Sequence, residues 1–179
     1  SEVGGVVVGL RDGDEVEAAH AAILRSVSER APEADVRGIL VARMITGGVE
    51  TMLGVKNDPS LGMTVVFGLG GIFVEIMHDV SVRVAPIGVE EAAVMIRQIK
   101  GYSLLDGARG TEPSDVQALA EAISSLSVFA AANQHTLESI DLYPSIVLPR
   151  GQRASATDTR SSHKPAPPAH HPPHPPPRV

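Results

Sequence analysis

The sequence predicts an α+β fold, in which helices flank a largely antiparallel sheet. Residues 80–84 alternate valine with Ser81 and Arg83, which is the two-residue period of a half-buried strand. The stretches 12–31 and 88–99 carry apolar residues three and four positions apart, which is the period of a helix. Short turns rich in Gly, Asp and Pro separate neighbouring strands, and this favours antiparallel pairing.

The first third of the chain is expected to form a strand, a helix and two further strands. The helix begins at a capping box made by Asp12 and Glu15 and ends near Ala31. Its apolar face consists of Val16, Ala19, Ile23 and Val27. The strands are expected at 4–10, 36–45 and 48–56, the last two joined at Gly47-Gly48. The Asp-Pro pair and the glycine in 57–62 predict a turn after them.

The rest of the ordered chain is expected to contain more strands and two helices. Strands are predicted at 63–68, 72–78, 80–85, 137–142 and 145–149, with a short one at 153–158. One helix spans about 88–99, and a second begins at the pattern Ser114-x-x-Gln117 and ends near Ala132. Pro86 ends the strand before the first of these helices.

The stretch GLGGIFVEIMHDVSVRVAP, residues 68–86, raises the question of a phosphate loop. Such a loop joins a strand to a helix, because the amides at the helix N-terminus bind the anion. Here the residues after Gly71 have the pattern of strands, so the glycines join strand to strand. A Rossmann or Walker loop is therefore not expected. The stretch instead places Glu75 and Arg83 on an otherwise apolar sheet.

Composition excludes several classes of protein. The chain has 179 residues, 43% hydrophobic and 20% charged, which suits one or two small globular domains. Its net charge of −6 and its lack of a basic stretch argue against a nucleic-acid partner. No apolar run approaches the length of a membrane span, so no membrane partner is expected. The absence of cysteine suits a reducing cytoplasm, which we expect as the location.

The C-terminal residues differ from the rest of the chain. We expect a domain over 1–160 and a disordered Pro/His-rich tail over 161–179, because polyproline segments form neither a core nor a strand ladder. The histidines of the tail suggest weak, adventitious metal affinity. A dedicated metal site is not expected there, since no fixed geometry holds the ligands.

Several segments of the chain together resemble a known family. They are GGVVVGL, then GILVARMITGGVETMLGVKNDPSLGMTVVFGLGGIFVEIMHDVSVRVAPI, then GYSLLDGARG, then SIDLYPSIVLP. This order is similar to the C-terminal part of the ATP-grasp domain of NDP-forming acyl-CoA synthetases. That family includes ADP-forming acetate-CoA ligases and acyl-CoA-synthetase-like protein acetyltransferases. The resemblance covers about residues 1–160.

The resemblance implies a nucleotide site for ATP or ADP. Main-chain groups of a hinge strand, here Val41, Ala42, Arg43 and Met44, would read the adenine. Glu50 would hold the ribose hydroxyls, because one carboxylate can accept hydrogen bonds from two neighbouring hydroxyls. Gly70, Gly71, Glu75 and Arg83 would lie beside the phosphates, although an ion pair of Arg83 with Glu75 or Asp79 is the alternative.

The resemblance also implies magnesium, and here the sequence departs from the family pattern. The family has Glu-x-Asp-x-Asn-Pro, whereas this chain has Ser139-Ile-Asp141-Leu-Tyr143-Pro. Asp141 is retained, but Tyr143 replaces the Asn that supplies an oxygen to the metal, and a neutral phenol is a poor Mg²⁺ ligand. Asp158 corresponds to a further family Asp. Metal binding through Asp141 and Asp158 is therefore doubtful.

The family reaction converts an acid, CoA and ATP into acyl-CoA, ADP and phosphate. The resemblance implies that this chain is the nucleotide-binding lobe of such a ligase, a fragment or truncated form. Its CoA-binding domain and its phosphohistidine domain would lie elsewhere or in another subunit, so the chain alone is expected to be inactive. The alternative is a degenerate, non-catalytic ATP-grasp module with weak nucleotide binding or a regulatory role.

Overall fold

The computed structural model describes residues 3–71 and 76–164. The chain divides into two compact units, Ser1–Thr46 and Gly47–Val179, and each is described by itself. The prediction of a disordered tail falls mostly on residues outside the described ranges.

The first unit contains the predicted helix, α1 (Gly13–Arg30). Asp12 caps it, because the backbone N–H of Glu15 donates to Asp12 Oδ1 at 2.9 Å. The carboxylate of Glu15 turns to Arg11, whose backbone N–H donates to it at 2.8 Å and whose guanidinium pairs with it. Ala19 and Ile23 are the buried residues of the helix, which confirms its predicted apolar face.

The strands predicted at 4–10 and 36–45 were wrong. Among the described residues, neither segment has strand structure, and neither belongs to the sheet. A strand is stable only when its N–H and C=O groups meet those of a neighbour. Leu40 and Val41 are accordingly 90% and 64% exposed, although their apolar pattern is that of a strand.

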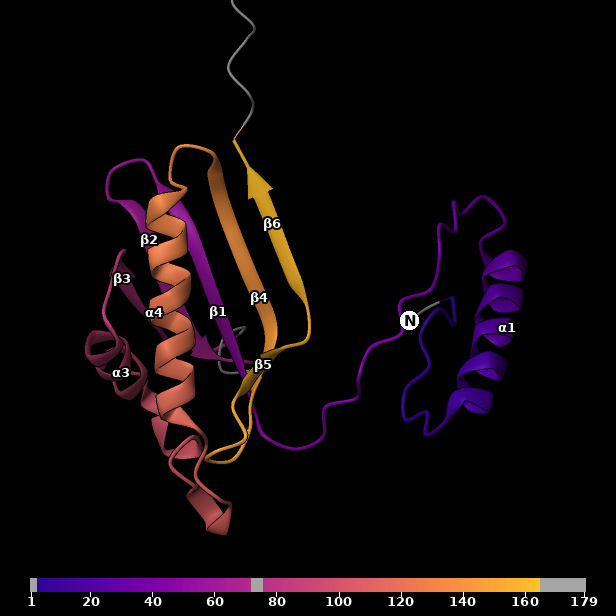
Figure 1. The fold of residues 1–179 in the computed structure, drawn as a ribbon, viewed down its shortest axis with the longest axis horizontal. Coiled ribbons are helices and arrows are strands. Elements are labelled where there is room, and N and C mark those ends of the chain that lie inside the picture. Colours follow the sequence, from indigo (N-terminus) through magenta and orange to yellow (C-terminus); the bar gives the residue numbers. More distant parts are fainter. Residues whose placement is uncertain (1–2, 72–75, 165–179) are drawn as a thin grey trace, which may run out of the picture. The chain divides into compact units, whose positions relative to one another are not determined.

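The second unit is built on an antiparallel sheet, as predicted. Its strands are β1 (Val49–Asp58), β2 (Gly62–Leu69), β3 (Val80–Val84), β4 (Leu137–Val147), β5 (Ala154–Ala156) and β6 (Thr159–His163). The order across the sheet is β3-β2-β1-β4-β5. On the edge of β4 away from β1, residues 145–147 pair with β5 and residues 137–142 pair with β6. Figure 1 shows β1 between β2 and β4, so β1 lies at the centre of the sheet.

The helices of the second unit cover one face of this sheet. They are α3 (Val89–Arg97) and α4 (Val116–Ala132), and the segment between them contains the 3-10 turns η1 (Lys100–Leu104) and η2 (Ala108–Gly110). Figure 1 shows α4 crossing β1 and β2. Alternate strand residues point toward the helices and form the core with them. Leu53, Val65 and Phe67 are 3%, 0% and 0% exposed there.

The opposite face, which we call the open face, carries the residues between those core positions. On β1 these are Glu50, Met52, Gly54 and Lys56, since Thr51, Leu53 and Val55 are buried. On β3 the valines at 80, 82 and 84 are exposed. Residues of β4 in register with this row, such as Asp141 opposite Gly54, share the open face.

Three predicted boundaries in the second unit need correction. Asp115, not Ser114, caps α4, because the backbone N–H of Ala118 donates to Asp115 Oδ1 at 3.1 Å. The strands predicted at 137–142 and 145–149 are one strand, β4, which continues through a bulge. The strand predicted at 72–78 lies mostly outside the described residues, and 76–77 form a turn.

The end of the sheet extends further than expected. β5 lies within the short strand predicted at 153–158, whereas β6 continues to His163, beyond the boundary placed at 160. A cross-strand hydrogen bond of 2.9 Å between the hydroxyls of Ser139 and Ser162 joins β6 to β4. Among the described residues, no helix has both the length and the apolar character that crossing a membrane requires.

Candidate functional site

A hollow of about 370 Å³ lies where β1 begins and β2 ends. Its lining includes Gly48, Glu50, Leu69 and Gly70 from this end of the sheet. Leu104, Ala108 and Thr111 line it from the segment between α3 and α4. Two of the residues that the sequence predicts for nucleotide binding, Glu50 and Gly70, are therefore brought together.

Glu50 and Gly70 are in direct contact. The backbone N–H of Gly70 donates to the carbonyl of Glu50 at 2.8 Å. A Cβ atom at position 70 would lie 2.6 Å from Glu50 Cγ and 2.8 Å from Glu50 Oε1, so the Glu50 side chain occupies that space. Glycine is thus needed at 70 to let the carboxylate lie over the end of β2. The carboxylate of Glu50 has no ion-pair partner among the described residues, and its side chain is exposed.

The next glycine is held by Tyr143. The backbone N–H of Gly71 donates to the Tyr143 hydroxyl at 3.2 Å. Gly71 has a φ of 59°, a left-handed conformation that favours glycine. Tyr143 belongs to β4, so its side chain crosses β1 to reach the end of β2. Both residues were predicted site positions, but their contact was not predicted.

Of the two predicted metal ligands, one lies on β4 and the other directly before β6, the strand that pairs with β4. Asp141 is opposite Gly54 on β1 and Arg160 on β6. A Cβ at Gly54 would lie 3.2 Å from Asp141 Oδ1, so the carboxylate leans over the bare backbone of β1. Asp158 directly precedes β6, and its Oδ1 accepts a hydrogen bond of 2.8 Å from the N–H of Thr159.

Within the described ranges, no group of three or more His, Asp or Glu side chains could hold a metal ion. A magnesium ion at a nucleotide needs fewer protein ligands, because one or two carboxylates act together with phosphate oxygens and water. Asp141 and Asp158 are carboxylates of the kind that such an ion takes, and metal binding through them stays a prediction.

Arg83 lies on the face opposite Glu50. It is in register with the core residue Val65, and its guanidinium pairs with Glu91 of α3 at 2.5 Å and donates to Gln98 Oε1 at 2.5 Å. The ion-pair alternative with Asp79 was wrong in its partner, because the carboxylate of Asp79 accepts from the backbone N–H groups of Lys100 and Gly101. A phosphate contact by Arg83 stays a prediction, and it would compete with these bonds to α3.

The other predicted contacts cannot be placed at the hollow. Glu75 lies outside the described residues. The stretch Val41, Ala42, Arg43 and Met44 belongs to the first unit and is exposed there without strand structure. Its adenine contact stays a prediction.

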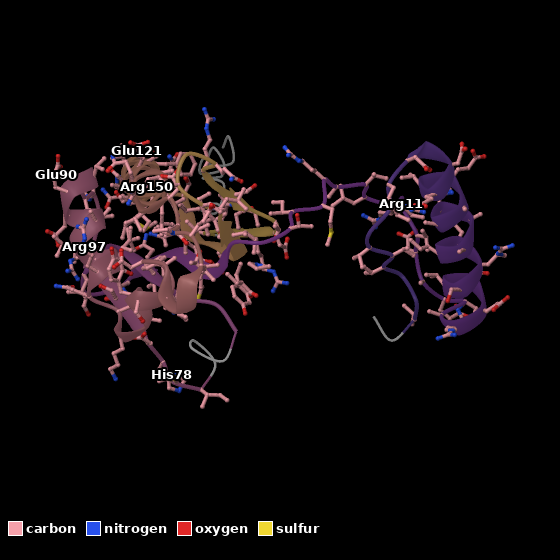
Figure 2. All side chains as sticks on the ribbon, turned by 90° about the horizontal axis from the view of Figure 1, so that it is seen from below. Arg11, His78, Glu90, Arg97, Glu121 and Arg150 are labelled. Carbon is pink, nitrogen blue, oxygen red and sulfur yellow. The ribbon has the colours of Figure 1, made fainter. Side chains whose placement is uncertain are left out.

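Sequence reasoning assigns no site residue to the segment 101–113, yet this segment lines two cavities. Besides the hollow at Glu50, it lines a cavity of about 270 Å³ together with Arg97, Asp115 and Arg150. Figure 2 labels both arginines, and neither has an ion-pair partner among the described side chains. The segment turns sharply at Gly107 and Gly110, which have φ of 90° and 80°. These two glycines are the signal in the sequence that could have indicated the turns.

Asp115 is the most heavily engaged carboxylate of this region. Its oxygens accept from the backbone N–H groups of Ala118, Gly151 and Arg153 at 3.1, 2.9 and 3.2 Å. The hydrogen bond from Ala118 lowers the pKa of Asp115, and the bonds from Arg153 and Gly151 and the charge of Arg150 add to it, against the opposing effect of burial.

Comparison with known proteins gives a consistent result. Residues 1–161 match the family model of the ATP-grasp domain. The β subunit of ADP-forming acetate–CoA ligase I from Pyrococcus furiosus is 42% identical over 144 residues, which cover 80% of this chain and 62% of that subunit. ADP-forming acetate–CoA ligase I from Archaeoglobus fulgidus is 40% identical over 151 residues, 84% of this chain and 22% of that protein.

A solved structure agrees with the sequence matches. The dinucleotide-forming acetyl-coenzyme A synthetase 1 of Ca. Korarchaeum cryptofilum, in complex with coenzyme A, Ca-AMPCP and HgCl+, superposes with a TM-score of 0.81 at 39% identity. The match covers 91% of this chain and 70% of that one. The chain thus spans less than two thirds of the length of the two curated relatives named above.

Proposed function

Because this chain belongs to the ATP-grasp domain family, we propose that it binds ATP or ADP at the hollow beside Glu50. The observation that carries the proposal is the Glu50 carboxylate, which lies against Gly70 at the edge of the hollow and has no ion-pair partner in the part of the chain that the structure describes. A carboxylate in this position accepts hydrogen bonds from the two ribose hydroxyls. Gly70 and Gly71 then lie beside the phosphates, as the resemblance implies.

We further propose that the chain supplies the nucleotide-binding part of an ADP-forming acyl-CoA synthetase. Its matched relatives are acetate–CoA ligases. In the whole reaction an acid, CoA and ATP give acyl-CoA, ADP and phosphate. The chemistry of CoA and of the phosphorylated histidine is assigned to other domains or to a partner subunit, so the chain alone binds nucleotide without turning it over.

Magnesium fits this proposal only together with the nucleotide. Asp141 and Asp158 would hold the ion, which neutralises phosphate charge when it is bound. Arg160, directly across from Asp141, adds positive charge near the same phosphates. The chain's own residues would thus supply two carboxylates and one guanidinium from β4, from β6 and from the residue before β6.

One observation favours the alternative of a degenerate module. Tyr143 stands where the family has a metal-binding Asn, and its hydroxyl accepts from Gly71. It offers the ion no amide oxygen, so nucleotide binding would be weak and insensitive to Mg²⁺ in such a module.

Glu50→Gln is expected to weaken ADP binding about tenfold, since one charged acceptor contributes about 1.5–3 kcal/mol and the amide keeps one of its two oxygens. Isothermal titration calorimetry of ADP measures the affinity. Glu138→Gln, an exposed glutamate on β4, is the matched control and should bind as the wild type does. Equal affinity in all three proteins would remove Glu50 from the site, and no binding by the wild type would refute the nucleotide proposal.

Tyr143→Asn is expected to make ADP binding depend on Mg²⁺, by about tenfold, because the amide oxygen supplies a third ligand beside Asp141 and Asp158. The measurement is the ADP affinity with and without Mg²⁺ in wild type and variant. A gain confined to the variant identifies a decayed metal site. The same Mg²⁺ effect in both proteins contradicts the assignment of position 143 as the missing ligand.

A further inference from the structure

We propose that Tyr143 is an autoinhibitory residue of the nucleotide site, whose hydroxyl occupies the Gly71 N–H that a nucleotide phosphate would otherwise bind. The inference rests on the proposed function, because Gly71 directly follows Gly70, which lines the hollow. Its basis is the hydrogen bond of 3.2 Å from the Gly71 N–H to the Tyr143 hydroxyl. This contact also gives Tyr143 a role at a position where its phenol is a poor metal ligand.

The fold holds Tyr143 in place through the bulge of β4. Between Leu142 and Ser145, β4 has one more residue than the facing segment of β1. Two hydrogen bonds fix this irregularity: Thr51 Oγ1 donates to the carbonyl of Ser145 at 3.0 Å, and Ser145 Oγ donates to the carbonyl of Leu142 at 3.1 Å. Thr51 is fully buried, so the bulge is anchored in the core. A bulge of this kind redirects the side chain at its tip.

The N–H of Gly71 has the properties of a phosphate donor. It belongs to a glycine turn with positive φ, and no side chain shields it on its own residue. Backbone N–H groups in turns of this kind can donate to anions. Tyr143 offers this N–H a neutral oxygen, whereas a phosphate offers a charged one, and hydrogen bonds to charged acceptors are about twice as strong. A nucleotide phosphate can therefore displace the Tyr143 hydroxyl. Its binding is weakened by the free energy of the hydrogen bond between Gly71 and Tyr143 that must break first.

The neighbouring glycine couples this exchange to Glu50. Gly70 donates to the Glu50 carbonyl and lies against the Glu50 side chain, so its position is set by β1. Gly71, in contrast, is held by β4, through the Tyr143 hydroxyl. Release of Tyr143 thus frees one amide without moving the ribose-binding carboxylate, and the effect should be on phosphate-bearing ligands alone.

Tyr143→Phe tests the proposal, since it removes the hydroxyl and keeps the ring. We expect it to bind ADP about 2- to 10-fold more tightly than the wild type in calorimetry without Mg²⁺, the ratio that corresponds to one net hydrogen bond. Its affinity for adenosine, which has no phosphate, should stay unchanged. The chain has two tyrosines, so Tyr102→Phe is the matched control and should leave both affinities as they are.

A second measurement is independent of ligand. Amide hydrogen exchange of Gly71, followed by NMR in the free proteins, should be about 2- to 10-fold faster in Tyr143→Phe than in wild type and Tyr102→Phe. Unchanged exchange, or equal or weaker ADP binding by Tyr143→Phe, overturns the autoinhibitory role. If neither protein binds ADP while Gly71 exchange rises, the nucleotide proposal fails and the contact itself is confirmed.

Discussion

Replacement of Phe67 by alanine is expected to lower the free energy of unfolding of the second unit by about 3–5 kcal/mol. Phe67 lies in the middle of β2 and is 0% exposed. Its neighbours across the sheet are Leu53 on β1 and Ser81 on β3, and its ring faces the helices. β2 is hydrogen-bonded to β1 and to β3, so its backbone cannot move into the space that the ring leaves. The loss of stability therefore includes the transfer free energy of the ring and the cost of the remaining cavity.

Urea unfolding followed by far-ultraviolet circular dichroism measures this loss. Phe129→Ala is the matched control, because Phe129 lies on α4 but is 52% exposed, and we expect a change of at most about 1 kcal/mol there. β2 carries Gly70 and Gly71 at its end, so Phe67→Ala should weaken ADP binding only in proportion to the unfolded fraction. Equal losses in the two variants would mean that the ring of Phe67 is not part of a packed core.

Several correct predictions rest on signals that are local in the chain. β1 and β2 are joined by the short turn after Asp58, whose carboxylate accepts from the backbone N–H groups of Ser60 and Leu61 at 2.8 and 3.0 Å. That turn and the alternating apolar residues are local signals, so pattern and structure agree. The helix caps at Asp12 and Asp115 are local in the same way, and the second was misplaced by a single residue.

The elements that failed are those whose partners are not set by local sequence. Residues 4–10 and 36–45 have the composition of strands, yet composition does not say what a strand pairs with. β6 shows the reverse: TRSSH has little apolar character, but it forms a strand because the free edge of β4 offers it hydrogen bonds. In both cases membership of the sheet, and not the composition of the segment, decided the outcome.

The sequence singled out Glu50, Gly70 and Tyr143, but it could not predict which face of the sheet each side chain takes. Glu50, Gly70 and Tyr143 are brought together because β1 lies between β2 and β4, an order that the sequence does not state. Arg83 alternates with valines, so its own strand pattern leaves open which face it takes. The helix α3, through Glu91, draws it to the covered face. Side-chain direction in such a strand becomes known only when the packing of the helices is known.

Replacement of Asp115 by alanine is the second large effect that we expect, a loss of about 2–4 kcal/mol in the free energy of unfolding. The side chain caps α4 and also accepts from the N–H groups of Gly151 and Arg153, so alanine leaves three backbone donors without this acceptor. Asp115 is only 8% exposed, and water cannot fully replace the carboxylate. Asp106→Ala is the matched control, since Asp106 is exposed at the same cavity and should change little.

The dependence on pH gives this prediction its sign. The pKa of Asp115 is lowered in the folded protein, chiefly by the bond from the Ala118 N–H, so the ionised carboxylate stabilises the fold. That contribution is fully present above the ordinary aspartate pKa of about 4 and is lost as the pH falls through the lower folded pKa. Asp115→Asn cannot ionise. The gap in urea-unfolding free energy between wild type and Asp115→Asn should therefore be constant from about pH 7 to 5 and narrow below about pH 4. The other lowered carboxylates, Glu15 and Asp58, are present in both proteins and cancel in this difference. A gap that widens as the pH falls would mean that the backbone amides around Asp115 do not stabilise its ionised carboxylate.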